Sequence, residues 1–302
     1  MNHHSVSSVA IVIVNYNGWR LTHDCLSSLQ DLEYASFQIV VVDNGSTDDS
    51  VTCLREKWPN LDLIEIEHNV GFTAANNMGG RRALEGDAEY VWFLNNDTVV
   101  DTAALSELVA TLEADPRAGA AASVLYEMRT PEQVQVWGGG FVRLWSGTAN
   151  TYFGPVPEKD LHFLAGTSWL IRRHVLETLG LFDERFFMYW EDADFSFRLR
   201  SAGWRLAVAT RSRVWHVGSA SMGDSSPTHK SEVFELTFTR STVHFLRKHA
   251  PVPLVPLLAG PGFYLIKRVL RGQWGRARAV ASGALQGLQR YKAQQMTFVS
   301  KA

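Results

Sequence analysis

Three acidic side chains lie within four residues in the segment YWEDADF: Glu191, Asp192 and Asp194. The aromatic residues Tyr189 and Trp190 precede them, and both an apolar environment and mutual repulsion raise the pKa of a carboxyl group. A carboxylate with a raised pKa can act as general base toward a hydroxyl group. The alternative is structural, because the helix dipole favours acidic residues at a helix N-terminus.

A second candidate pair consists of Asp97, which follows the apolar run YVWFL, and His216 in the segment RVWHVG. One carboxylate and one imidazole suit Mg²⁺ or Mn²⁺ held partly by a substrate's phosphates better than a closed zinc site. Over a hundred residues separate the two, so their spacing does not show that they meet. A hydrogen-bonded structural histidine is the alternative for His216.

The first half of the chain alternates short apolar runs with helical patterns. Strands are expected at 9–15, 38–44, 61–67, 90–96 and 118–125, and helices near 20–30, 47–57, 73–86 and 101–114. This alternation predicts an α/β fold with a mostly parallel sheet, and the continuously apolar central runs indicate that helices cover both of its faces.

Polar residues stand where these expected strands end, at Asn15, at Asp43 and Asn44, and at 95–97. Ligands of open α/β sheets bind beyond the carboxyl ends of the strands, so these residues are expected to meet in one crevice. Asp43 and Asn44 could instead serve only to form a turn. The chain contains neither G-x-x-x-x-G-K-[ST] nor G-x-G-x-x-G, which disfavours a P-loop and a dinucleotide fingerprint.

The second half differs in character. The Gly- and Trp-rich stretch 134–147 predicts a β-ribbon or loop that lines a site, and a strand followed by a short helix is expected up to Gly180. A helix over 192–202 and a strand at 203–209 follow. We therefore expect one domain at 1–228 with two halves of different character, at about 8–125 and at about 126–228.

Residues 229–302 are expected to form a basic, amphipathic helical region. From Leu236 onward the chain has eleven Lys and Arg and no Asp or Glu, although the net charge of the whole chain is −2. Such a region suggests an anionic membrane surface as a partner. Nucleic acid is not expected, because the acidic remainder would repel its phosphates. A homodimer through these helices stays open.

The location of the protein is expected to be cytoplasmic, or peripheral at the inner face of the membrane. The N-terminal MNHHSVSS lacks the features of a secretory signal, and the apolar stretch 251–266 is too short and too rich in proline to span a bilayer. Cys25 and Cys53 both fall in expected helices, so no disulfide is expected.

Several motifs occur in a fixed order over about residues 8–220: VAIVIVNYNG, VVDNGSTDDS, NVGFTAANNMG, WFLNNDT, FDERFFMYWEDADFSFRLRSAGWRL and RVWHVGSAS. Together they resemble the family 2 glycosyltransferases of GT-A fold, in particular the rhamnosyltransferase-like members. The resemblance implies inverting transfer of a sugar from a nucleoside diphosphate donor to an acceptor hydroxyl, most specifically L-rhamnose from dTDP-L-rhamnose. The implied acceptor is a growing cell-surface glycan or a lipid-linked saccharide.

The resemblance implies that 1–228 is the catalytic domain, with a donor-binding half at about 8–125 and an acceptor/catalytic half at about 126–228. It also implies roles for single residues. Asp192 would be the catalytic base, and Asp97 and His216 would hold a divalent metal, Mg²⁺ or Mn²⁺. The family's metal motif has an acid where this chain has Asn95, which implies weaker metal binding. The donor-binding residues would be Asn15, Tyr16, Asp43, Asn44, Gly71, Asn77, Asn95, Asn96 and Asp97. Trp190, Glu191 and Asp194 would lie on the acceptor side.

Three alternatives remain open. The first is a transferase that uses a UDP- or GDP-sugar. The second is a sugar-1-phosphate nucleotidyltransferase, which would call for a Gly-rich basic loop after the first strand, where this chain has NYNGWRLT. The third is a scaffold that binds a nucleotide without catalysis, although the presence of Asp97, Asp192 and His216 together argues against it.

Overall fold

The computed structural model describes residues 7–218 and 231–289. Its main sheet has the strand order β3-β2-β1-β4-β11-β6-β12-β5, with β7 paired to β6. The strands are β1 (Val9–Asn15), β2 (Phe37–Asp43), β3 (Asp62–Glu65), β4 (Tyr90–Asn95), β5 (Thr98–Val100), β6 (Ala118–Glu127), β7 (Val134–Trp137), β11 (Ser168–Arg172) and β12 (Arg205–His216). A smaller sheet, in the order β10-β8-β9, contains β8 (Gly139–Arg143), β9 (Thr148–Thr151) and β10 (Phe163–Leu164).

The predicted α/β fold with a mostly parallel sheet is confirmed. Strands β3, β2, β1, β4, β6 and β12 run in the same direction, and the exceptions are β11, β7 and the short β5. Strand β11 lies between β4 and β6 and is antiparallel to both. The beginning of β11 therefore meets the carboxyl end of β4, where Ser168 is paired with Leu94.

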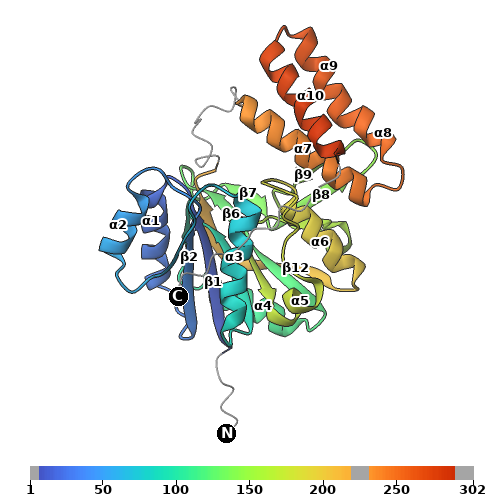
Figure 1. Ribbon diagram of the computed structural model, residues 1–302. Coiled ribbons are helices and arrows are strands. Elements are labelled where there is room, and N and C mark those ends of the chain that lie inside the picture. The colour runs from blue at the N-terminus through green and yellow to red at the C-terminus, as the bar shows by residue number, and fades with distance from the viewer. Residues whose placement is uncertain (1–6, 219–230, 290–302) are drawn as a thin grey trace.

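Helices cover both faces of the sheet (Figure 1): α1 (Trp19–Gln30), α2 (Ser50–Lys57), α3 (Phe72–Glu85), α4 (Ala104–Ala114), α5 (Arg173–Leu179) and α6 (Glu191–Ser201). The continuous apolar run of β1 is explained by this arrangement, because all of its residues are buried. Ile11 and Ile13 pack with residues of α1 and α4, whereas Ala10 and Val12 pack in the cluster that contains residues of α3, α5 and α6.

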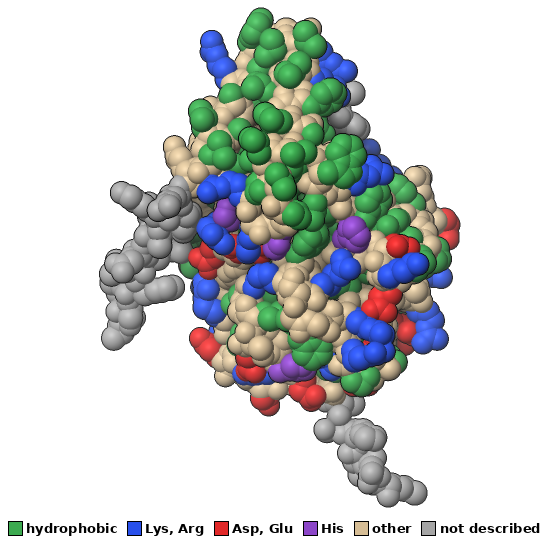
Figure 2. Space-filling model, turned by 90° about the vertical axis from the view of Figure 1, so that its right-hand side faces the viewer, with side chains coloured by type: hydrophobic (Ala, Val, Ile, Leu, Met, Phe, Trp, Pro, Cys, Tyr) green, Lys and Arg blue, Asp and Glu red, His purple; other side chains and the backbone are tan. Residues whose placement is uncertain are grey.

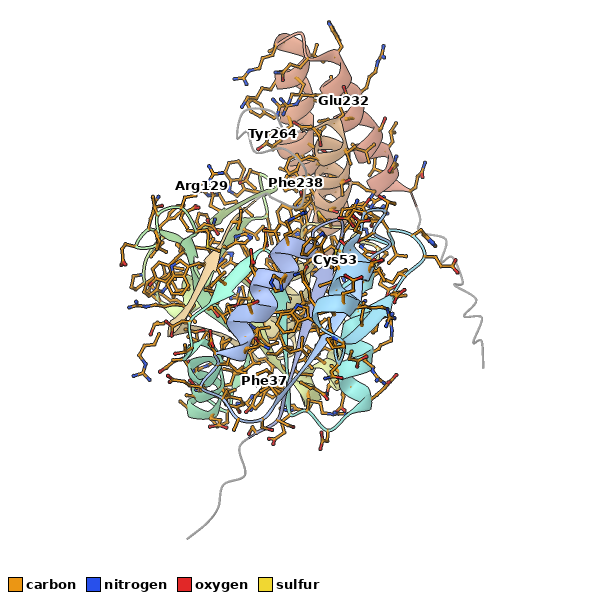
Figure 3. All side chains as sticks on the ribbon, turned by 90° about the vertical axis from the view of Figure 1, so that its left-hand side faces the viewer. Phe37, Cys53, Arg129, Glu232, Phe238 and Tyr264 are labelled. Atoms are coloured by element: carbon orange, nitrogen blue, oxygen red, sulfur yellow. The ribbon has the colours of Figure 1, made fainter. Side chains whose placement is uncertain are left out.

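The C-terminal helices form a unit that protrudes from the α/β body (Figure 1). It consists of α7 (Glu232–His249), α8 (Leu254–Leu257), a π-helical segment (Leu258–Gly262), α9 (Phe263–Leu270) and α10 (Trp274–Leu288). Phe245 and Leu246 of α7 share a hydrophobic cluster with Phe186 and Trp190 of the body. Phe238 lies at the same junction (Figure 3), so α7 connects the protruding unit to the segment that carries the acidic cluster.

Within the two described ranges, the C-terminal unit included, no helix combines the length and the apolar composition needed to cross a bilayer. The boundary expected at residue 228 lies in the stretch between the two ranges, outside the described residues, and stays a prediction.

Candidate active site

The carboxyl ends of three neighbouring strands bring polar residues to one edge of the sheet. In the parallel register of β1 with β2, Asn15 is paired with Asp43, and in that of β1 with β4, Val14 is paired with Asn95. Asp97 follows β4 by two residues, and His216 ends β12. Residues that are far apart in the sequence therefore line the same edge.

Asn15 and Asp43 are held in a network that also includes Ser46 and Thr22. The Asn15 amide donates to Asp43 Oδ2 at 2.7 Å and accepts from the Thr22 hydroxyl at 2.7 Å. Asp43 additionally accepts from the backbone N–H and the hydroxyl of Ser46, at 2.9 and 2.7 Å. Asp43 therefore forms the turn after β2, and this turn stands beside Tyr16, which is 39% exposed.

Asn44 and Asn77, which are expected to bind the donor, make hydrogen bonds within the protein. Asn44 Oδ1 accepts from the backbone N–H of Val70 at 3.0 Å. The Asn77 amide donates to the Phe182 carbonyl and accepts from the Phe182 N–H, at 2.8 and 3.0 Å.

Gly71 has a backbone role of the same kind. Its φ is +95°, and a Cβ atom there would lie 2.6 Å from Phe187 Cδ2. Any larger residue would therefore push Phe187 away. Asn44, Gly71 and Asn77 thus position the loops that frame the site.

Asp97 and His216 meet. Asp97 Oδ1 lies 3.3 Å from His216 Nε2, and the backbone N–H of Val217 donates to the Asp97 carbonyl at 3.0 Å. The other ring nitrogen of His216, Nδ1, donates to Gln135 Oε1 at 2.7 Å. Because Gln135 Oε1 accepts the hydrogen bond of Nδ1, Nε2 is the ring nitrogen that faces the carboxylate.

The Asp97–His216 pair fits a divalent cation. Asp97 is 2% exposed, and its Oδ1 atom has no hydrogen-bond partner. A buried carboxylate oxygen that faces an imidazole nitrogen requires positive charge between them, either a proton on Nε2 or a metal ion. In the described parts of the chain, no group of three or more His, Cys, Asp or Glu side chains could hold a metal. The remaining ligands would have to come from a substrate or from water.

Asp192 lies in the first turn of α6, and its carboxylate is fixed by two backbone donors. Gly166 N–H donates to Asp192 Oδ2 at 3.1 Å, and Ala193 N–H donates to Oδ1 at 2.7 Å. The neighbour of Gly166, Thr167, accepts at its carbonyl from the Asn95 N–H at 2.9 Å. Two hydrogen bonds thus connect Asp192 to the end of β4, just before Asp97.

The adjacent carboxyl groups of Glu191 and Asp192 differ in what stabilises their charge. Burial, and then the charge of Asp192, raises the pKa of Glu191 to about 8, and its Oε2 atom has no hydrogen-bond partner. Burial also raises the pKa of Asp192, but backbone N–H groups oppose that shift. Asp192 therefore ionises first, and Glu191 keeps its proton at neutral pH. One ionised carboxylate results, partly exposed and available as a base.

The two residues before these acids have unusual backbone conformations. Tyr189 and Trp190 both have positive φ, at 70° and 71°, which is costly for side chains of this size. Packing against α7 offsets that cost: the Trp190 ring lies 4.5 Å from the Phe245 ring, and Ser241 Oγ donates to the Met188 carbonyl at 2.8 Å.

Trp190 and Asp194, expected on the acceptor side, face α7 instead. Trp190 is buried against Phe245, as described. Asp194 is fully buried and accepts from His249 Nε2 and from Lys248 Nζ, both at 2.7 Å. Burial alone would raise the pKa of Asp194, but these hydrogen bonds and the charges of Lys248 and Arg198 lower it below its usual value. The helical periodicity of α6 explains the difference, because residues 192 and 194 point to different sides of a helix.

We predict that Asp194→Asn lowers the free energy of unfolding by about 3 kcal/mol, the usual cost of removing one partner from a buried ion pair. Because the folded-state pKa of Asp194 is lowered, this contribution is present at neutral pH and is lost as the pH falls through that pKa. Chemical denaturation at pH 7 and at acidic pH measures both effects. Glu177→Gln, in an exposed pair with Arg173, is the matched control and should change stability by less than about 0.5 kcal/mol. Equal losses in the two variants would contradict the prediction.

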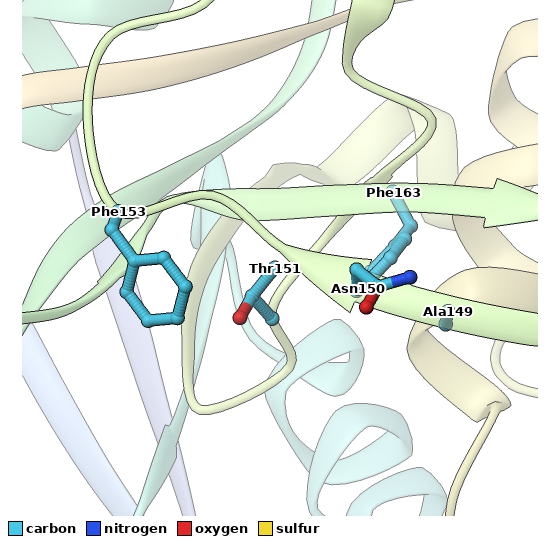
Figure 4. Close-up of a pocket in the computed structure, with 5 residues that line it drawn as sticks. All are labelled: Ala149, Asn150, Thr151, Phe153 and Phe163. Atoms are coloured by element: carbon cyan, nitrogen blue, oxygen red, sulfur yellow. The ribbon is translucent and has the colours of Figure 1, made fainter.

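A pocket of about 300 Å³ lies on the smaller sheet, lined by Ala149, Asn150, Thr151, Phe153 and Phe163 (Figure 4). Strand β10, which includes Phe163, leads within three residues to Gly166 beside Asp192. This pocket is therefore connected through a short segment to the carboxylate that could act as base. Apolar and aromatic side chains with a few polar groups are the usual lining of a small-molecule site.

Sequence reasoning missed Gln135, Gly166 and Thr22. Gln135 lies in the predicted ribbon, but nothing in its spacing points to His216. Gly166 had a detectable signal, since it precedes an apolar strand in LAGTSWLI, yet its partner Asp192 lies 26 residues away. A Cβ atom at Gly166 would come within 3.1 Å of Asp192 Cβ, so this glycine allows the carboxylate its place.

The mixed sheet with helices on both faces has the GT-A fold, which it shares with solved glycosyltransferase structures. A mannosyltransferase from Pyrobaculum calidifontis, solved in complex with GDP-Man and Mn²⁺, superposes with a TM-score of 0.58 at 19% identity, over 93% of this chain and 74% of that chain. The chain belongs to the glycosyl transferase family 2, whose sequence profile matches residues 10–180.

Two curated relatives extend the comparison. The chain is 32% identical over 207 residues to the O-antigen biosynthesis protein RfbC of Myxococcus xanthus, covering 65% of this chain but only 16% of that protein. It is 26% identical over 254 residues to the N-acetylglucosaminyl-diphospho-decaprenol L-rhamnosyltransferase of Mycobacterium tuberculosis, covering 76% of this chain and 82% of that protein. The predicted family is therefore confirmed.

Proposed function

We propose that the protein is an inverting glycosyltransferase that moves a sugar from a nucleoside diphosphate donor onto a hydroxyl group of a growing cell-surface glycan or lipid-linked saccharide. The observation that carries this proposal is the junction of two sites at one sheet edge. The Asp97–His216 pair lies at the end of β4, and Asp192 is connected to the same strand end through Gly166 and Thr167.

Each site would have its own task. The nucleoside would lie over the turns at Tyr16 and Asp43, and the diphosphate near Asn95, Asn96 and Asp97. A divalent cation held by Asp97 and His216 would neutralise charge that develops on the leaving diphosphate. Asp192 would take the proton of the acceptor hydroxyl as that oxygen attacks the anomeric carbon from the opposite side. A single displacement of this kind inverts the anomeric configuration.

For the donor, we propose dTDP-L-rhamnose. The support is the relative that is named as an L-rhamnosyltransferase, which matches over most of both chains. A UDP- or GDP-sugar is the second candidate, supported by the fold shared with a mannosyltransferase bound to GDP-Man. The 26% and 19% identities of these two proteins support the transferase class more strongly than either sugar.

A donor panel tests the proposal. Release of nucleoside diphosphate is measured with dTDP-rhamnose, UDP-glucose, UDP-galactose and GDP-mannose, each with Mg²⁺, with Mn²⁺ and with chelator. Titration calorimetry with the same donors measures binding in the absence of an acceptor. We expect release from dTDP-rhamnose with metal. Binding of a different donor alone would change the proposed sugar but keep the glycosyltransferase class. If none of the donors binds, the transferase proposal is contradicted.

A further inference from the structure

The outer face of the C-terminal unit carries large apolar side chains that no other described part of the chain covers. In α9 no residue is buried. Phe263, Ile266 and Leu270 are three and four residues apart and so share one side of the helix, with Phe263 59% and Leu270 82% exposed. Six exposed residues make up what we call the outer apolar face: Leu254, Leu258, Phe263, Ile266, Leu270 and Trp274. Figure 2 shows hydrophobic side chains spread over this unit.

Basic side chains without acidic partners accompany this face. Arg268 and Arg276 are paired with the buried Glu235. Lys267, Arg271 and Arg278 have no acidic group within ion-pair distance among the described residues. Since no Asp or Glu occurs from Leu236 onward, the chain itself offers little negative charge to this unit. The complementary charge has to come from elsewhere.

A hairpin of the body extends the same surface. Trp145 lies between β8 and β9 and is exposed. This hairpin contacts the C-terminal unit directly, because a Cβ atom at Gly260 would lie 2.5 Å from the Ser146 carbonyl oxygen. Tryptophan side chains are favoured where apolar and aqueous phases meet. The position of Trp145 therefore suits a boundary of that kind.

We propose that the outer apolar face docks onto an anionic membrane surface, with α9 lying in the plane of the lipid–water interface. Exposed aromatic and aliphatic residues next to unpaired Lys and Arg are typical of helices that bind at this depth. With 8 residues, α9 is about 12 Å long and much shorter than the hydrocarbon core. Anionic headgroups supply the charge that Lys267, Arg271 and Arg278 lack.

A second copy of this chain is the competing occupant. Two such units placed face to face would bring like charges together, since each carries no acidic residue from Leu236 onward. A lipid surface avoids this repulsion and adds attraction. The observations therefore favour lipid, and self-association becomes an outcome that the experiment can detect.

The test is co-sedimentation of the full chain with vesicles of phosphatidylcholine, with and without phosphatidylglycerol, at low and high salt. We expect binding to the anionic vesicles that weakens as salt rises. Lys267→Gln with Arg271→Gln and Arg278→Gln should weaken partitioning by roughly 100-fold, about fivefold for each charge. Phe263→Ser with Ile266→Ser and Leu270→Ser should abolish it.

Matched controls come from the body of the protein. Arg129→Gln with Arg200→Gln removes exposed charges, and Phe153→Ser removes an exposed aromatic ring, and neither should reduce binding. Binding of the wild type to neutral and anionic vesicles alike, or to neither, would overturn the proposal. A second outcome would also overturn it: sedimentation velocity shows a dimer, the triple variant at Phe263, Ile266 and Leu270 dissociates that dimer, and the wild type binds no vesicles. The measurement needs no donor and no turnover, so its outcome is independent of the proposed transferase activity.

Discussion

Asp192→Asn should lower the rate of sugar transfer by about 100-fold or more, the usual scale for loss of a general base, and leave donor binding largely unchanged. The amide keeps the size of the carboxylate and can still accept from the Gly166 N–H, so the fold of the 165–167 turn should persist. It cannot take a proton from the acceptor. Single-turnover transfer and donor titration measure the two quantities separately. Normal turnover would remove Asp192 from the mechanism.

The neighbouring residue supplies a control of the same chemistry. Glu191→Gln makes the same change one residue earlier, and it should retain activity within about tenfold, because Glu191 already carries a proton at neutral pH. For the same reason, the acid limb of the pH–rate profile, which reports the ionisation of Asp192, should keep its position in this variant. If Glu191→Gln greatly lowered the rate of sugar transfer and Asp192→Asn lowered it only slightly, Glu191 and not Asp192 would be the base.

The protonation of Glu191 can also be tested through stability. Its folded-state pKa of about 8 lies above the ordinary 4.5, so the folded state binds more protons, and its stability falls as the pH rises between these values. Glu191→Gln does not titrate. Its stability relative to the wild type should therefore increase from pH 5 to about pH 8. A constant difference would mean that Glu191 is ionised in the folded protein.

The sheet and its polar edge could be predicted because they follow from local patterns. The apolar runs of β1 and β4 are continuous, and the polar residues that end them must fall at one edge when the strands are parallel. The chemistry of Asp97 and His216 suggests a metal pair, but their spacing in the sequence does not show that they meet. Their contact depends on β12 running parallel to β6 and antiparallel to β5, which is long-range information that no short pattern contains.

The acidic cluster shows the limit of this reasoning. Glu191, Asp192 and Asp194 look equivalent in the sequence, yet the structure separates them by their neighbours. Asp192 accepts from two backbone N–H groups, Glu191 lacks a partner for Oε2, and Asp194 is paired with Lys248 and His249. Except for the adjacent Ala193, these partners come from a turn before β11 and from the end of α7, which are remote in the chain. Only tertiary packing distinguishes the acid that we propose as base from the acid that holds the C-terminal helix.

Substitution of Asp97 in the proposed metal site is expected to have the second large effect on sugar transfer. Asp97→Asn should reduce the stimulation of donor binding by Mn²⁺ or Mg²⁺ to near zero and slow transfer by about 100-fold or more, since a Lewis acid supplies several kcal/mol of charge stabilisation. The folded protein should lose no stability. An amide in place of the orphaned Oδ1 can donate to His216 Nε2, 3.3 Å away, and so satisfy both groups without a cation.

The opposite substitution makes the test symmetric. Asn95→Asp adds a carboxylate two residues before Asp97, at the position where the resemblance places the first acid of the metal motif. This variant should bind Mn²⁺ more tightly than the wild type in the absence of donor, because hard cations prefer charged oxygen ligands. Calorimetry of metal alone, and of donor with and without metal, separates the contributions of the protein and the diphosphate. If Asp97→Asn and Asn95→Asp both left metal binding unchanged, the buried carboxylate at the end of β4 would serve only to hold a protonated His216.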